Sequence, residues 1–171
     1  GKGFRNFAFY GYDRFMWSME RRKSFCGKIS QAGFQTEVYK STLEQNRKNW
    51  KDEKTIISRW LKSLPKPVGL MACNDDHAYQ ILEICRTENI RVPDEIAVIG
   101  ADDDELICST SSPPLSSVAV DFEKSGFQGA EMLDRMMKGE DITGQCAYCP
   151  AKHVVERQST DVFVMKDESV V

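Results

Sequence analysis

Residues 66–105 read KPVGLMACNDDHAYQILEICRTENIRVPDEIAVIGADDDE, the pattern of a strand, a helix and a second strand. The apolar runs at residues 68–72 and 96–99 are short and end abruptly in polar residues, which is typical of buried strands. Between them, apolar residues recur at helical spacing until Pro93 interrupts the pattern. The segment therefore predicts two parallel strands joined by a helix, the basic unit of an open α/β sheet.

Acidic side chains follow both of these strands. Asp75 comes just after the first strand, and Asp102 just after the second. The carboxyl ends of parallel strands meet at one edge of a sheet, where open α/β folds bind ligands, so we expect Asp75 and Asp102 to face one crevice. Because ionised carboxylates accept hydrogen bonds and do not donate them, the crevice suits a ligand rich in hydroxyl groups.

The rest of the chain alternates strands and helices in the same way. Residues 105–114 show no regular pattern, and residues 115–120 are expected to be an extended segment that leaves the sheet. The alternation predicts an α/β fold with a doubly wound parallel sheet and helices on both faces. Further strands are expected at residues 6–10, 36–39 and 153–155, and further helices at residues 16–32, 52–64 and 122–138.

Two positions outside residues 66–105 point to the same crevice. Trp17 and Arg21 lie one turn apart near the start of the first helix, where the helix dipole disfavours a cation. Arg21 either belongs to a solvated first turn or points toward Asp75 and Asp102, and geometry alone does not choose between these. Trp50, in a polar loop at residues 40–51, either staples that loop down or covers a ligand.

Composition limits the classes of protein to which the chain can belong. Its 171 residues suffice for one domain with a sizeable core, and 41% hydrophobic and 29% charged residues are ordinary for a soluble globular protein. A net charge of −3 gives no support to a nucleic-acid-binding surface. No apolar run approaches the length of a membrane span, and the first residues lack the apolar segment of an export signal.

The six cysteines are scattered, and their usage favours a reducing cytoplasm. Cys146 and Cys149 have the spacing of a metal half-site, but no second such pair accompanies them. We interpret them as ordinary loop cysteines in preference to a zinc half-site or a redox pair, and we predict neither a metal nor a cofactor. The chain also lacks the GxSxG, HExxH, GxxxxGK[ST] and strand-to-helix GxGxxG patterns, so we expect no catalytic residue and a binding protein rather than an enzyme.

Four stretches carry a specific resemblance, which covers roughly residues 3–160. Together they resemble the effector-binding core of the lactose/galactose-repressor family of regulators, which has a periplasmic-binding-protein-like fold of two lobes. The segment NFAFYG at residues 6–11 and Trp17 are most similar to xylose-responsive members of that family. The four stretches are MACNDD at residues 71–76, IRVPDEIAVIGADDDE at 90–105, PLSSV at 114–118 and VERQST at 155–160.

The resemblance implies a set of ligand-binding residues. Arg21 matches the effector-contacting arginine on the first helix of this lobe, and Asp102 matches the acid after the fourth strand. Trp17 resembles a tryptophan of the xylose-responsive members, and Trp50 falls near an aromatic residue that covers the effector. The implied ligand-binding residues are Trp17, Arg21, Trp50, Asn74, Asp75 and Asp102.

The resemblance also implies a domain organisation. Residues 1–112 would form the C-terminal lobe of the sensor, residues 113–146 a crossing segment and a helix of the other lobe, residues 147–164 a return strand, and residues 165–171 a linker tail. The other lobe is expected before residue 1, and a DNA-binding module of the arabinose-regulator type after residue 171. Without that lobe, the apolar stripe of the helix at residues 122–138 is expected to pack on a second chain or to fold back.

The expected function is that of a sugar-sensing domain of a bacterial transcription regulator, with D-xylose or another pentose as the effector. Such a regulator would be cytoplasmic, without membrane contact, homodimeric, and bound to DNA only through a module outside this chain. A solute-binding protein of a sugar transporter is the alternative. An enzyme that uses Asp75 and Asp102 as an acid/base pair is a third possibility.

The charge balance leads to a prediction about nucleic acid. With a net charge of −3 and no helix-turn-helix pattern, the 171-residue chain should not bind operator DNA at physiological salt. Fluorescence anisotropy with labelled operator DNA checks this, and specific binding that weakens as salt rises would contradict it.

Overall fold

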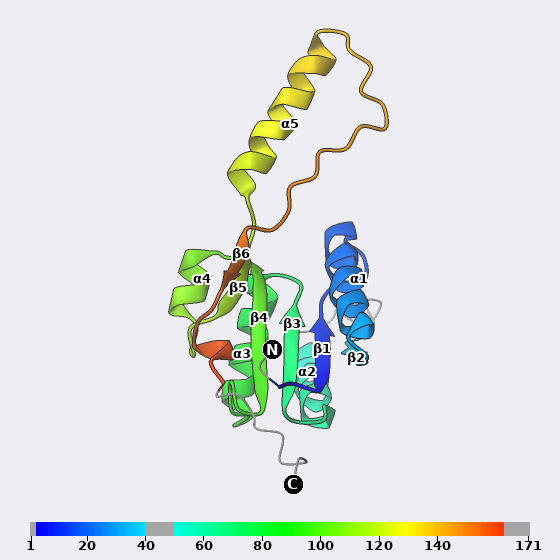
Figure 1. Cartoon of the computed structure of the whole chain (residues 1–171). Helices are drawn as coiled ribbons and strands as arrows, with labels where there is room; N and C mark the ends of the chain where they lie inside the picture. Colours follow the sequence, from blue (N-terminus) through cyan, green and yellow to red (C-terminus); the bar gives the residue numbers. More distant parts are fainter. Residues whose placement is uncertain (1–2, 40–49, 163–171) are drawn as a thin grey trace.

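A single sheet of six strands runs through residues 3–39 and 50–162, the part of the chain that the computed structural model describes (for residues 50–52, the backbone only). The strand order is β2-β1-β3-β4-β5-β6, and the first five strands are parallel (Figure 1). Their bounds are β1 (Asn6–Tyr10), β2 (Thr36–Val38), β3 (Val68–Ala72), β4 (Ile96–Asp102), β5 (Ser116–Ala119) and β6 (His153–Val155).

Helices lie on both faces of this sheet (Figure 1), and alternate residues of each strand point to opposite faces. On one face, Ala8 and Tyr10 of β1 join a buried cluster with Ile57 of α2. On the other face, Phe9 packs against Phe25 of α1, with ring centroids 6.2 Å apart. The helices are α1 (Met16–Gln31), α2 (Trp50–Ser63), α3 (Asp75–Thr87), α4 (Glu105–Thr110) and α5 (Phe122–Met137), with a 3-10 turn η1 (Gln158–Thr160).

The main core lies between α2, α3 and α4 on one side and the central strands on the other. Leu70 of β3 and Val98 of β4 are almost fully buried there against Leu61 of α2 and Ile81 of α3. The predicted strand–helix–strand unit therefore forms, with β3 paired to both β1 and β4 in parallel. The α/β fold with a doubly wound sheet is confirmed.

Details of the predicted fold around α4, β5 and β6 differ from the structure. Residues 105–110 form α4 rather than irregular chain, because Asp104 caps the helix by accepting from the backbone N–H of Ile107. The extended segment at residues 115–120 does not leave the sheet at once, since β5 pairs with β4. The last strand, β6, runs antiparallel to β5 because the chain returns from α5 to the same edge that β5 has just left.

The helix α5 extends away from the sheet together with the loop that follows it (Figure 1). None of its residues is buried, and the exposed side chains include Phe127 and Met137. The expectation that this helix folds back on the sheet is therefore wrong, whereas its packing on a second chain stays a prediction.

The expected linker tail, residues 165–171, lies outside the described residues. Within residues 3–39 and 50–162, no helix has the length and apolar content that crossing a bilayer requires.

The core makes a direct prediction about stability. Leu61 is completely buried, so Leu61→Ala should lower the free energy of unfolding by about 2–5 kcal/mol through lost burial and a residual cavity. Leu106 on α4 is 73% exposed, and Leu106→Ala should change it by less than about 0.5 kcal/mol. Urea unfolding of the two variants measures the difference, and equal losses would contradict this account of the core.

Candidate functional site

An open pocket of about 380 Å³ lies at the carboxyl ends of β3 and β4. Its walls come from the segments after β3 and β4 and from the first residue of α5. This is the edge at which the sequence predicts a shared crevice for Asp75 and Asp102, and both residues line it. The other lining residues are Asp76, Asp103, Asp104, Ile107 and Phe122.

Arg21 links three elements at this edge. Its Nη1 donates to the carbonyl oxygen of Cys73 at 2.6 Å, and its Nη2 donates to Oδ1 of Asp102 at 2.6 Å. Of the two interpretations of Arg21, the structure therefore supports the one in which the side chain points toward the crevice. The side chains of Arg21 and Asp102 remain 26% and 28% exposed, so both can be reached from solvent. A guanidinium carries five N–H donors, more than these two contacts use.

An aromatic pair stands beside Arg21. The rings of Phe15 and Trp17 are stacked, with centroids 5.8 Å apart and an interplanar angle of 17°. The guanidinium carbon of Arg21 lies 5.4 Å from the centroid of the Trp17 ring, a cation–π distance. Both aromatic side chains are exposed. The arrangement can take a ligand that has an apolar face and a polar rim.

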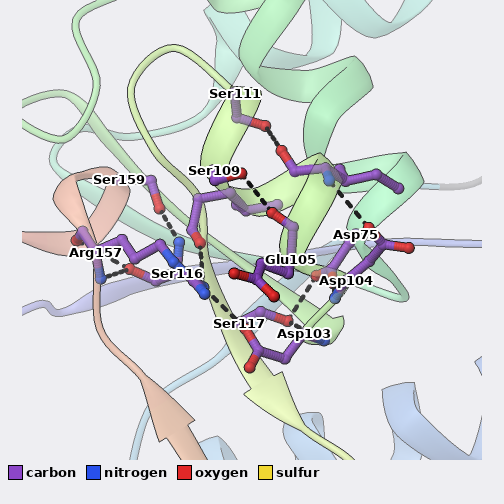
Figure 2. Close-up of polar contacts among 12 residues, drawn as sticks. Asp75, Asp103, Asp104, Glu105, Ser109, Ser111, Ser116, Ser117, Arg157 and Ser159 are labelled. Carbon is purple, nitrogen blue, oxygen red and sulfur yellow. Dashed lines mark hydrogen bonds and ion pairs between the residues drawn. The ribbon is translucent and has the colours of Figure 1, made fainter.

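Asp75 has a different environment from Asp102, although both follow neighbouring strands. It is only 2% exposed, and its carboxylate accepts from the hydroxyl of Ser117 at 2.6 Å and from the backbone N–H of Asp104 at 2.8 Å (Figure 2). Burial raises the pKa of Asp75 more than these hydrogen bonds lower it. The two carboxylates at this edge thus have different partners. Asp102 pairs with a cation, and Asp75 accepts hydrogen bonds from two neighbouring segments of the chain.

The side-chain oxygen of Asn74 has a structural role. It is the N-cap of α3, and its Oδ1 accepts from the backbone N–H of His77 at 3.1 Å and also contacts the ring Nδ1 of His77. His77 is buried against the rings of Tyr10 and Tyr12, and its Nε2 has no hydrogen-bond partner. Burial lowers the pKa of His77, so the imidazole is held neutral.

The structure also shows which functional candidates the sequence reveals and which it does not. Trp50 begins α2 instead of lying in a loop, and its side chain is outside the described residues. Phe15, Ser117, Asp103 and Arg157 take part in the contacts around the crevice without having been predicted to do so. Ser117 carries a detectable signal, since a serine in an apolar strand needs a hydrogen-bond partner once it is buried.

The cysteine pair after α5 remains apart from this crevice. Cys146 is exposed, and Sγ of Cys149 donates to Oε1 of Gln128 on α5. Among the residues that the structure describes, no group of three or more His, Cys, Asp or Glu side chains is arranged to hold a metal ion.

Comparison with known proteins places the chain in a family. The family model of the periplasmic binding protein-like domain matches residues 1–160. The chain belongs to this family. It is 34% identical over 173 aligned positions to the xylose operon regulatory protein of Escherichia coli strain K12, and 33% identical to that of Haemophilus influenzae. In both comparisons, the match takes in 99% of the chain and 44% of the relative.

A solved structure gives the same result in three dimensions. The structure of a xylose-binding transcription activator superposes with a TM-score of 0.82 at 34% identity, over 95% of this chain and 43% of that protein. The family resemblance seen in the sequence is thereby confirmed. The chain spans less than half the length of the relatives that it matches.

The buried imidazole beside the crevice predicts a pH dependence. Because the pKa of His77 is lowered on folding, the unfolded chain binds more protons than the folded one as the pH falls through about 6.5. This contribution to stability is present above that pH and is lost below it. Urea unfolding at pH 7.5 and 5.5 should show that His77→Gln loses less stability than wild type over this interval. His153→Gln, at an exposed position of β6, should keep the wild-type difference; an unchanged difference in His77→Gln would contradict the prediction.

Proposed function

We propose that this chain is the sugar-sensing lobe of a bacterial transcription regulator, with D-xylose or another pentose as its effector. The observation that carries the proposal is the contact of Arg21 with Asp102 beside Trp17, in a chain 34% identical to a xylose operon regulatory protein. The proposed ligand-binding residues are Trp17, Arg21, Trp50, Asn74, Asp75 and Asp102, of which Asp75 and Asp102 line the pocket after β3 and β4.

The chemistry of a pentose matches this edge. Its hydroxyl groups can donate to the carboxylate of Asp102, and Arg21 can donate to a hydroxyl or ring oxygen. Asn74 can offer its amide nitrogen while its oxygen caps α3. Because Arg21 and Asp102 are already in contact, part of the cost of ordering them is met before the sugar arrives.

The aromatic pair supports the same class of ligand. A sugar ring has an apolar face of C–H groups, which can lie on the ring of Trp17 while the hydroxyl groups around the rim reach the polar residues. Phe15 stacks on Trp17, so the two rings together offer an exposed aromatic surface to the apolar face of a sugar.

Sensing, in this proposal, is a shift of equilibrium rather than a reaction. Residues 1–112 form one lobe, residues 113–146 cross to the other lobe, and residues 147–164 return. A sugar held between two lobes favours the closed arrangement, and a DNA-binding module outside this chain responds to the change. We propose a cytoplasmic homodimer for the complete regulator, consistent with free cysteines at Cys73, Cys85 and Cys108.

Two observations favour the sensor over the alternatives. The named relatives are transcription regulators, which disfavours a component of a sugar transporter. An acid/base pair of Asp75 and Asp102 is disfavoured because the oxygens of Asp75 are occupied by Ser117 and by the N–H of Asp104.

The proposal predicts which substitutions abolish the response. Loss of one charge-assisted contact typically costs about 1.5–3 kcal/mol, or roughly ten- to a hundredfold in affinity. In the full-length regulator, Arg21→Ala and Asp102→Ala should each weaken xylose binding by at least about tenfold without unfolding the protein. Calorimetric titration with xylose, ribose, arabinose and glucose measures the affinities.

Arg22→Ala is the matched control. Arg22 is the next residue of α1 and pairs at the surface with Asp13, away from Asp102. Its substitution should leave the affinity for xylose within about twofold of wild type. Unchanged affinity in both Arg21→Ala and Asp102→Ala would remove these residues from the site, and a wild type that binds ribose or arabinose in place of xylose would redirect the effector assignment.

A further inference from the structure

The backbone that presents Asp102 is in an unusual conformation. Asp102 has a φ of 110° and Asp103 a φ of 55°, both in the region that glycine favours and other residues rarely adopt. Such conformations persist only where the surrounding structure holds them in place. The position of the Asp102 carboxylate therefore depends on whatever fixes residues 102–104.

Two groups hold this backbone from the inside. The N–H of Asp103 donates to the hydroxyl oxygen of Ser117 at 3.1 Å, and the N–H of Asp104 donates to Asp75 at 2.8 Å (Figure 2). The hydroxyl of Ser117 in turn donates to Asp75 at 2.6 Å. Gly100 permits this arrangement, because a Cβ at that position would collide with the carboxylate of Asp75. The loop after β4 is thus fastened to α3 and to β5.

A third group holds it from the outside. Nη1 of Arg157 donates to Oδ1 of Asp103 and to the carbonyl oxygen of Leu115, both at 2.9 Å (Figure 2). Arg157 follows β6, and its backbone N–H donates to the hydroxyl oxygen of Ser116 in β5 at 2.7 Å. The buried hydroxyl of Ser159, two residues further on, donates to the carbonyl oxygen of Val98 in β4. Arg157 therefore sits where the outgoing strand, the returning strand and the loop after β4 meet.

This junction connects α5 to the sheet, because β5 leads to α5 and β6 leads back from it. Any reorientation of α5 relative to the sheet must pass through these two paired strands. Ser117 of β5 and Arg157, two residues after β6, both contact Asp103, and Asp103 is the neighbour of Asp102. A chain of direct contacts thus joins the connection to α5 with the acid of the crevice.

We propose that Arg157 is a positioning residue that acts on sugar affinity through Asp103 and Asp102, and so couples the direction of β5 and β6 to occupancy of the crevice. Arg157 does not contact the sugar. The proposal rests on the proposed function, since it concerns regulation of that site. It assigns the same supporting role to Asp75 and Ser117, which hold the opposite side of the loop.

A double-mutant cycle tests whether Arg157 acts through Asp102. Xylose affinity is measured by calorimetry in the full-length regulator for wild type, Arg157→Gln, Asp102→Asn and the double variant. Arg157→Gln should weaken binding roughly tenfold in the wild-type background and less than about twofold in the Asp102→Asn background. A merely structural role would instead give similar losses in both backgrounds.

Two further variants separate positioning from general damage. A single nitrogen of Arg157 donates both to Asp103 and to the carbonyl oxygen of Leu115. In Arg157→Lys, the side-chain ammonium can replace that nitrogen, so the xylose affinity should return to within about threefold of wild type. Arg86→Gln is the surface control, since Arg86 is 61% exposed on α3 and pairs only with Glu83 among its described contacts. It should leave xylose affinity unchanged.

The outcomes distinguish the two proposals. Suppose that wild type binds xylose. The positioning role alone is then overturned by normal affinity in Arg157→Gln, by additive losses in the cycle, or by no recovery of affinity in Arg157→Lys. A wild type that binds no sugar would overturn the proposed function, and this inference with it. Small-angle scattering adds a second readout: at saturating xylose, Arg157→Gln should show a smaller decrease in radius of gyration than wild type.

Discussion

A carboxylate that is 2% exposed must be hydrogen-bonded, and Asp75 meets this requirement with the hydroxyl of Ser117 and the N–H of Asp104. These partners come from β5 and from the loop after β4, while Asp75 itself begins α3. One buried group therefore fixes three segments at the carboxyl edge of the sheet. Removal of any of them would leave a buried polar atom without a partner, so the segments depend on one another.

This requirement explains why two aspartates at the ends of adjacent strands behave differently. Burial is the main reason that the pKa of Asp75 is raised, and it outweighs the hydrogen bonds from Ser117 and Asp104; the nearby carboxylate of Asp102 raises the pKa further. Asp102 stays partly exposed and faces the guanidinium of Arg21. The inner carboxylate supports the loop, and the outer carboxylate is presented to the crevice. A ligand can then meet a charged group whose position is already settled by contacts beneath it.

Much of this arrangement could be predicted from the sequence, because it follows from the order of the strands. Apolar runs at β3 and β4 place Asp75 and Asp102 at one edge, and Arg21 falls at that edge because α1 starts there. What could not be predicted is which oxygen meets which donor. Residue type shows that Asp75 can accept hydrogen bonds, but only the packing of β5 and of the loop after β4 shows that Ser117 and the N–H of Asp104 donate them.

The other errors of prediction also have physical reasons. The helix α4 is six residues long with only Cys108 buried, so it has no apolar periodicity to detect. The direction of β6 depends on where the chain re-enters the sheet after α5, which local composition does not record. The polar neighbours of Trp50 predict a loop, although the backbone of α2 already begins there.

The antiparallel pair of β5 and β6 gives the fold a property that the parallel strands lack. In the parallel part, the crossover helices α2 and α3 pack back on the sheet and are held by the core, as Leu61 and Ile81 show. The segment between β5 and β6 contains α5, none of whose residues is buried, so α5 is joined to the sheet through those two strands. The loop of Asp102 is linked to this end of the sheet by hydrogen bonds from the N–H of Asp103 to Ser117 and from Arg157 to Asp103. The point at which the chain leaves the sheet is therefore joined by direct hydrogen bonds to the loop that presents Asp102.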